Sequence, residues 1–413
     1  MGAMTTTVFT NGLVFDGVAG ELRELDVVVE GERIVDVSES RIRSSGGDRI
    51  DLGGRTLMPG LIDAHVHAYF PDVDAGRGDR LPATAVSHWA ARMLHASLMR
   101  GFTSVRDTGG GDVGLHLAIE RGWLDAPRLF YCGKAISQTG GHGDMRRQGE
   151  IEPCGCAQGY EGHLSRTADG ADEIRRAVRE ELRQGASFIK IMGSGGVASP
   201  TDPIHAAQYS DEEIRAAVDE TERHGAYVTA HVHPDGAVRR AIELGLRCIE
   251  HGTMISEDTA RLAAERGTAI VPTMAVVMSL AEHGVELGFP EVSLRKLAVV
   301  HPIALHGVEV MRRAGVRLGF GTDLIGRLER YQCTEFTIRR EVMPAVEILR
   351  SATSVNAGII GAGDRLGRIA PGMLADLIAV DGNPLEDVSL FDEHGSRVRI
   401  VMKGGRLYKH AAR

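Results

Sequence analysis

One stretch decides the fold of this chain: Leu57-Met58-Pro59-Gly60-Leu61-Ile62-Asp63-Ala64-His65-Val66-His67. Its apolar run is short, is interrupted only by Pro59-Gly60 and is followed by polar residues, which predicts a buried strand. Side chains two positions apart on a strand share a face, so His65 and His67 point the same way, about 7 Å apart along the backbone. Both imidazoles can therefore reach one cation, and Asp63 on the same face can orient a ligand. The alternative is a pair of surface histidines near a loop.

Length and composition bound the class of protein. A chain of 413 residues is long for one compact core, which favours one large domain and a smaller one. Hydrophobic and charged contents of 43% and 25% are typical of a soluble globular protein. A net charge of -9 without a basic cluster argues against nucleic acid as a partner. No run of about 18 apolar residues occurs, so no membrane association is expected.

Cysteine usage and the first residues indicate the compartment. Five cysteines cannot all pair, and only Cys154 and Cys156 lie close in sequence, which favours a reducing, cytoplasmic location. Cys-x-Cys is an alternative soft-metal site, but two such residues without a second pair are more often free thiols. The N-terminus lacks the charged region and apolar core of a signal peptide. Residues 1–3 resemble a cloning remnant before Met4.

Short strands with hairpin turns are predicted at both ends of the chain. They span residues 7–9, 25–30, 33–37, 375–380 and 397–402. Neither end has enough apolar residues to fold alone. We therefore expect a small β-sandwich domain assembled from residues 4–57 plus 366–413, beside a larger domain of residues 58–365.

Between the two ends, strand, loop and helix repeat eight times. The predicted strands span residues 57–67, 103–106, 129–132, 188–192, 227–231, 248–251, 269–272 and 316–323. A helix is expected around 88–100 and another at 211–224, where Ser210 and Glu213 form a capping box. Eight such units predict an α/β fold, a (β/α)₈ TIM barrel. A doubly wound sheet is the alternative, but no Gly-x-Gly-x-x-Gly turn follows the first strand.

Chemistry in a barrel gathers at the carboxyl ends of the strands. The side chains expected there are four imidazoles, one amine and one carboxylate, namely His65, His67, Lys190, His231, His251 and Asp323. Lys190 stands out because an ammonium between apolar neighbours is costly to bury. It is tolerable as a salt-bridged lysine, or as a carbamate formed with carbon dioxide, which is anionic and can bridge two cations. This convergence favours a metal site over surface histidines.

The ordered set His-x-His, Lys, His, His, Asp resembles the amidohydrolase superfamily over essentially the whole chain. The most similar branch contains imidazolonepropionase-like proteins and metal-dependent Xaa-Pro and Xaa-Arg/Lys dipeptidases and carboxypeptidases. The motifs that carry the resemblance lie at residues 58–67, 139–144, 189–192, 208–210, 249–253, 321–323 and 371–377.

The resemblance implies two divalent metal ions, for which zinc suits the ligands best. One ion is expected on His65, His67 and Asp323, and the other on His231 and His251. N-carboxylated Lys190 and a hydroxide would bridge them, and the shared hydroxide would attack the substrate carbonyl. Asp323 would be the general base that delivers the proton to the leaving nitrogen.

Two further residues follow from the resemblance. His142 is expected to contact the substrate and Tyr209 to polarise the scissile carbonyl, although a loop histidine bonded to backbone is the alternative for His142. His233 is read either as a site residue or as a solvated turn residue. Loops at 151–167 and 273–304 are expected to act as lids or specificity walls, with Met274 and Met278 as candidate pocket residues.

The expected reaction is hydrolysis of a small-molecule amide or peptide, with dipeptides and N-acyl amino acids as the leading class. Deamination is disfavoured because Pro234 stands where deaminases carry a proton-shuttling glutamate. Aryl amides, phenylureas and carbamates are the alternative, since the residues after Asp323 are larger than in the peptidases. Arg327 or Arg330 is a candidate for binding a substrate carboxylate. A non-catalytic barrel is the remote alternative, and a homo-oligomer is expected because such barrels frequently associate.

Overall fold

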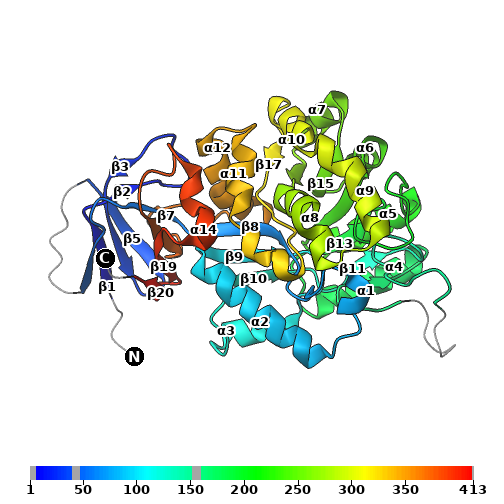
Figure 1. The fold of residues 1–413 in the computed structure, drawn as a ribbon. Helices are drawn as coiled ribbons and strands as arrows, with labels where there is room; N and C mark the ends of the chain where they lie inside the picture. The colour runs from blue at the N-terminus through cyan, green and yellow to red at the C-terminus, as the bar shows by residue number, and fades with distance from the viewer. Residues whose placement is uncertain (1–5, 40–46, 151–159, 412–413) are drawn as a thin grey trace.

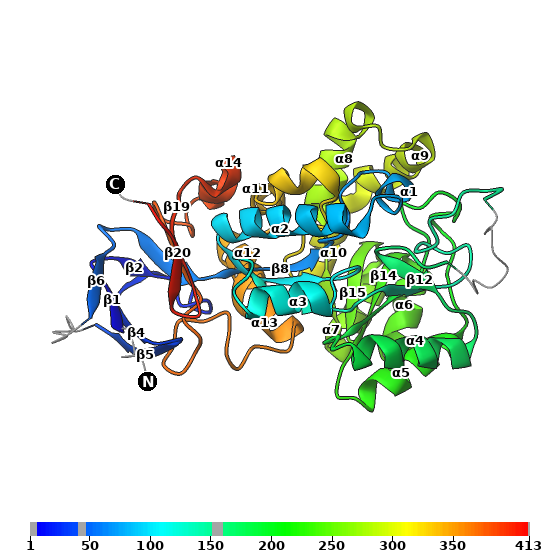
Figure 2. The same cartoon turned by 90° about the horizontal axis from the view of Figure 1, so that it is seen from below.

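The computed structural model describes residues 6–39, 47–150 and 160–411. A small β domain lies at one end of the molecule and a barrel surrounded by helices at the other (Figures 1 and 2). This is the predicted architecture, a TIM barrel with a β-sandwich. The predicted domain boundaries themselves stay a proposal, and the Cys154 and Cys156 prediction lies outside the described residues. No helix in the described ranges is long and apolar enough to cross a membrane.

Two sheets form the β domain, and both ends of the chain contribute. The first has the order β5-β4-β1-β6 and contains β1 (Thr6–Thr10), β4 (Asp26–Glu30), β5 (Arg33–Ser38) and β6 (Asp48–Asp51). The second has the order β20-β19-β18-β7-β2-β3 and contains β2 (Leu13–Val14), β3 (Arg23–Glu24), β7 (Thr56–Pro59), β18 (Leu377–Val380), β19 (Val398–Lys403) and β20 (Arg406–His410).

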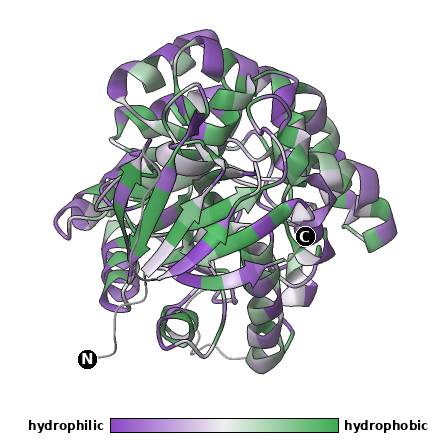
Figure 3. Cartoon of the chain, turned by 90° about the vertical axis from the view of Figure 1, so that its left-hand side faces the viewer, coloured by the Kyte–Doolittle hydropathy of each residue, from purple (hydrophilic) through white to green (hydrophobic). Residues whose placement is uncertain are grey.

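Apolar side chains from the two sheets meet in one core. Phe9 and Val27 from the first sheet pack in the same buried cluster as Leu57, Leu377 and Ile400 from the second. Figure 3 looks onto this end and shows hydrophobic and hydrophilic residues sharing the same strands, as expected when one face of a sheet is buried and the other solvated. The first sheet is therefore held in part by packing on strands from the far end of the chain.

Eight parallel strands form the barrel, at the eight predicted positions. They are β8 (Leu61–Val66), β9 (Phe102–Asp107), β10 (Arg128–Tyr131), β13 (Ile189–Met192), β14 (Val228–Pro234), β15 (Cys248–Met254), β16 (Ala269–Val271) and β17 (Arg317–Leu318). Two shorter strands, β11 (Ala135–Ser137) and β12 (Ser165–Thr167), extend the sheet beside β13.

The barrel closes through hydrogen bonds between its first strand and the segment after its last. The Ala64 amide donates to the Phe320 carbonyl at 2.8 Å, and the Asp323 amide donates to the His65 carbonyl at 2.8 Å. The second of these bonds ties the backbone of two predicted ligands together. Only Gly60 separates β8 from β7 of the sandwich, so the two domains share a nearly continuous chain at this point.

Helices cover the barrel. They are α1 (Ala75–Gly78), α2 (Ala83–Met99), α3 (Val113–Glu120), α4 (Ala171–Arg183), α5 (Asp211–Glu222), α6 (Asp235–Glu243), α7 (Glu257–Arg266), α8 (Met274–Leu287), α9 (Glu291–Val300), α10 (Ala304–Arg313), α11 (Thr334–Arg340), α12 (Ala345–Arg350), α13 (Asn356–Ile359) and α14 (Asp392–Gly395). The capping box of Ser210 and Glu213 at the start of α5 is present as predicted.

One expectation about the fold is wrong. Residues 273–304 were expected to contain loop material, but they form α8 and α9. Val276, Val277 and Leu280 of α8 are buried, and so is Leu297 of α9. The two helices therefore bring apolar side chains over the end of the barrel.

Candidate active site

A cavity opens at the carboxyl ends of the barrel strands. Its polar lining includes the predicted ligands. These are His65, His67, Lys190, His231, His251 and Asp323. Apolar side chains form much of the remaining wall, including Phe70, Met145, Leu164, Met192, Val197, Val276, Val277, Leu280, Leu297, Val300 and Ile325. The six side chains, which are widely separated in sequence, thus share one chamber.

The first group of potential metal ligands is His65, His67 and Asp323. The Nε2 atoms of the two histidines are 3.3 Å apart. The Asp323 Oδ1 atom lies 3.3 Å from Nε2 of His65 and 3.2 Å from Nε2 of His67. Three ligand atoms, from the first barrel strand and from the segment after the last, therefore converge on one point.

The second group is His231, His233 and His251, whose ligand atoms lie within 4.8 Å of one another. The rings of His231 and His251 are 4.5 Å apart between centroids, and those of His233 and His251 are 4.9 Å apart. His233 is buried, so its reading as a solvated turn residue is wrong. The sequence did carry a signal, because His231-Val232-His233 repeats the His-x-His spacing of the first strand.

Neighbouring acceptors orient the histidine rings. The Nδ1 atom of His65 lies 2.8 Å from a Glu250 carboxylate oxygen, and that of His67 lies 3.1 Å from the Gly109 carbonyl. The Nδ1 atom of His251 lies 2.8 Å from the Thr273 hydroxyl. A histidine that uses Nδ1 in this way keeps Nε2 available as a ligand.

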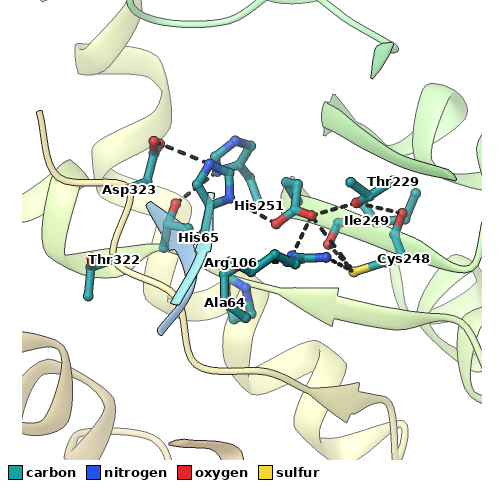
Figure 4. A network of polar contacts seen from close by, with 12 residues as sticks. Ala64, His65, Arg106, Thr229, Cys248, Ile249, His251, Thr322 and Asp323 are labelled. Carbon is teal, nitrogen blue, oxygen red and sulfur yellow. Dashed lines mark hydrogen bonds and ion pairs between the residues drawn. The ribbon is translucent and has the colours of Figure 1, made fainter. Parts of the chain in front are cut away.

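Arg106 and Thr229 belong to a buried polar network behind His65 (Figure 4), which is anchored by Glu250. Its carboxylate accepts a hydrogen bond from the Arg106 guanidinium at 2.6 Å, and another from the Thr229 hydroxyl. Arg106 also donates to the Ala64 carbonyl at 2.6 Å. The side chains of Glu250 and Arg106 are both fully buried, and Arg106 and His65, by Coulombic attraction and hydrogen bonding, outweigh burial and lower the pKa of Glu250. The network therefore presents an ionised carboxylate to the first histidine.

The charges around the imidazoles suit a cation. Burial and the neighbouring imidazoles hold the pKa values of His231 and His251 well below their usual range, so their lone pairs are free at neutral pH. At His65, burial lowers the pKa, but Asp323 and Glu250 outweigh it and raise the pKa. The carboxylates that attract a proton there would attract a divalent ion to the same place.

Lys190 lies in the cavity wall and is 2% exposed. Burial lowers the pKa of its amine, while Glu250 and Asp323 act in the opposite direction. The residue is on β13, the direct neighbour of β14, which carries His231 and His233. Its position fits the predicted bridging role.

Two of the site residues have unusual backbone conformations. His251 has a φ of 69° and Asp323 a φ of 54°, in the left-handed region that non-glycine residues rarely adopt. Such conformations persist only where the surrounding structure enforces them, and they cluster at functional sites. His251 lies within β15 and Asp323 in the segment after β17, and both residues line the cavity.

The other predicted residues divide into those in the cavity and those outside it. His142 lines the cavity, and its ring stacks on His231 with centroids 3.9 Å apart. Tyr209 does not line it, and its hydroxyl donates to the Ala168 carbonyl at 3.1 Å. This placement gives no support to a role in polarising the substrate. Arg327 and Arg330 are exposed and lie outside the cavity lining.

Met274 and Met278 also lie outside the cavity lining, which α8 supplies through Val276, Val277 and Leu280 instead. Sequence reasoning missed Glu250. Its signal was a carboxylate within a predicted buried strand, directly before the candidate ligand His251.

Gly196 lies against the rings of His142 and His231, so a larger residue there tests whether the packing of these rings matters for activity. A methyl group at this position would overlap the ring of His142 and would lie 2.5 Å from Nε2 of His231. We expect Gly196→Ala to lower kcat/KM by about 10²-fold, because displacement of site groups by about 1 Å has an effect of that size. The measurement is steady-state kinetics with Gly236→Ala as control, since no atom lies within 4 Å of a methyl group there. Equal losses in both variants would refute the packing argument.

Comparisons with known proteins agree with this geometry. The model described as the amidohydrolase family matches residues 56–408. Ochratoxinase from Aspergillus niger is 33% identical over 98% of this chain and 86% of its own length. The crystal structure of a prolidase complexed with N-methylphosphonate-L-proline is 46% identical, with a TM-score of 0.95 over 98% of this chain and 100% of the other. A Xaa-Pro dipeptidase with bound methionine is 32% identical, with a TM-score of 0.88 over 98% of this chain and 100% of the other.

Proposed function

The chain belongs to the amidohydrolase family and is a hydrolase that acts on amide bonds, and from this premise we propose that it cleaves the amide between an apolar acyl group and an amino acid. N-acyl amino acids and dipeptides are the proposed substrates. The observation that carries the proposal is the cavity, in which two clusters of metal-ligand side chains face a wall of aliphatic and aromatic residues. A prolidase and a dipeptidase among the similar structures support the class.

The residues present fit two divalent ions. His65, His67 and Asp323 would hold one ion, and His231 and His251 the other, with His233 as a neighbouring donor. Lys190 would lie between them as a carbamate, formed when its neutral amine adds to carbon dioxide and loses one proton. Bound zinc or a similar ion would polarise the substrate carbonyl and make water nucleophilic at neutral pH.

The chain's own groups then divide the proton transfers. Asp323 accepts a proton from the attacking water and gives it to the leaving nitrogen, a role that its position between His65 and His67 allows. His142 lines the cavity and donates to the carbonyl oxygen as negative charge develops there. The apolar wall excludes water from the acyl side of the bond.

A specific observation favours a second candidate function, hydrolysis of aryl amides, phenylureas or carbamates. Among the described residues, the cavity lining contains no arginine, and Lys190 is its one lysine. A dedicated cationic partner for a substrate carboxylate is therefore not part of the lining. Substrates without a carboxylate would fit the same chamber.

A substrate screen separates the two candidates. We expect turnover of N-acyl amino acids, with kcat/KM at least about 10-fold higher for an N-(4-methylpentanoyl) than for an N-acetyl compound, because additional buried methylene groups contribute binding energy. The measurement is release of the free amino acid, with a chelator-treated sample as the metal-free control. Turnover of anilides or phenylureas alone would end the first proposal in favour of the second.

A further inference from the structure

Lys296 connects α9 to the loop after β13. Its ammonium donates to the carbonyls of Gly196 and Ser199 at 2.9 and 2.8 Å, and to the Ser199 hydroxyl at 3.3 Å. It also lies 3.3 Å from a carboxylate oxygen of Asp202. The Lys296 side chain is 11% exposed and that of Asp202 is 2% exposed. A buried ammonium is costly unless its hydrogen bonds are satisfied, so these partners fix the position of the Lys296 side chain.

The Ser199 hydroxyl continues this chain of contacts to the cavity. It lies 2.8 Å from Nδ1 of His142. Asp202 is the other acidic neighbour of that nitrogen, but at 3.7 Å it is too distant for a hydrogen bond. The Asp202 carboxylate is engaged by the Gly196 amide at 2.9 Å as well as by Lys296. Ser199 is therefore the partner that decides the state of Nδ1.

The direction of each hydrogen bond follows from donor chemistry. An ammonium can only donate, so Ser199 accepts from Lys296 through a lone pair of its oxygen. The hydroxyl proton is then left to be donated, and the shortest acceptor is Nδ1 of His142 at 2.8 Å rather than the Gly196 carbonyl at 3.3 Å. The Gly196 carbonyl already accepts from Lys296. A neutral imidazole that accepts at Nδ1 carries its proton on Nε2.

We propose that Lys296 and Ser199 are positioning residues that fix His142 in the tautomer protonated at Nε2, so that it donates a hydrogen bond into the cavity. The use of that hydrogen bond on a substrate carbonyl rests on the proposed function. A ring that accepts a hydrogen bond at Nδ1 is uncharged, because an imidazolium donates from both nitrogens. Without the serine hydroxyl, the other tautomer would place a lone pair toward the carbonyl oxygen and repel it.

The helix that carries Lys296 also forms part of the cavity wall. Leu297 follows it directly in the sequence, and both Leu297 and Val300 line the chamber. Figure 1 shows α9 beside α8 over the barrel. Helix α9 therefore supplies apolar side chains to the cavity wall and also carries Lys296, which holds the hydrogen bonds that orient His142.

Nitrogen-15 spectra of histidine-labelled protein supplied with zinc test the proposal directly. The signals that disappear in His142→Gln are those of His142. We expect wild-type His142 to be protonated at Nε2. In Ser199→Ala we expect His142 to shift toward the tautomer protonated at Nδ1. Ser199→Thr keeps a hydroxyl and should restore the wild-type state, as should Lys296→Arg in part. Ser351→Ala is the control, since Ser351 is a buried serine that donates to Ile348 within a remote helix.

Kinetics add a second readout. We expect Ser199→Ala to lower kcat about 10- to 100-fold with little change in KM, which is a weakened form of losing one oxyanion donor. In a His142→Gln background, Ser199→Ala should cause no further loss of kcat, because both changes remove the same interaction.

A wild-type His142 protonated at Nδ1, or a spectrum unchanged in Ser199→Ala, would overturn the proposal. The predicted tautomer in a protein that hydrolyses no amide of the screen would instead contradict the proposed substrates and leave the positioning role standing.

Discussion

Asp323→Asn is expected to lower kcat by about 10²- to 10⁴-fold, the range for loss of a general base. The carboxylate lies within 3.3 Å of two histidine nitrogens, so the amide would also remove the negative charge from that group. Asn is nearly isosteric and tolerates the left-handed φ of 54° at this position. The loss should therefore be chemical rather than structural, and we expect the thermal unfolding transition to stay cooperative.

Metal content by atomic emission and steady-state kinetics are measured on the same samples. Asp381→Asn is the matched control, because Asp381 pairs with Arg55 and Arg399 in the β domain, away from the cavity. The control should keep its metal content and kcat. An Asp323→Asn enzyme with wild-type kcat would refute the assignment of the base.

Glu250→Gln is expected to lower both the free energy of unfolding and the affinity for metal. Glu250→Gln leaves the Arg106 guanidinium fully buried without a counter-ion, and breaking such a pair costs about 3–5 kcal/mol of unfolding free energy. The same change removes the carboxylate that orients His65 through Nδ1. We expect metal affinity to fall about 10- to 100-fold, as for other residues that orient a ligand.

Denaturant titration and competition with a chelator measure the two quantities. Glu347→Gln is the control, because Glu347 binds Arg312 through both oxygens but its side chain is 38% exposed. A partly exposed pair contributes about 0–1 kcal/mol, so this control should leave stability within that range. Wild-type stability in Glu250→Gln would show that Arg106 finds other partners.

The fold could be predicted because its signals are local. Strand alternation places His65 and His67 on one face, and the eightfold rhythm of strand and helix specifies a closed barrel, so the six candidate ligands could be gathered at one end. The cap at Ser210 is equally local, since its partner Glu213 is three residues away. Each of these features depends on neighbours in the sequence.

Other features depend on contacts that a single sequence does not display. Residues 274–287 and 291–300 form α8 and α9, which bury apolar side chains such as Val276, Leu280 and Leu297 against the cavity. The pairing of Arg106 with Glu250 joins positions 144 residues apart. Tyr209 follows a family motif, but its hydroxyl faces Ala168 rather than the chamber. Tertiary packing decides all three.

The pairing of β7 with β18 has a consequence for biosynthesis. Met58 lies opposite Ile378 in this antiparallel pair, and β19 and β20 follow beyond β18. During translation, β7 is synthesised more than 300 residues before β18, so the second sheet cannot be completed until translation is nearly finished. Long-range strand pairing of this kind is slow, and the exposed edge of β7 is then the segment most in need of chaperone protection.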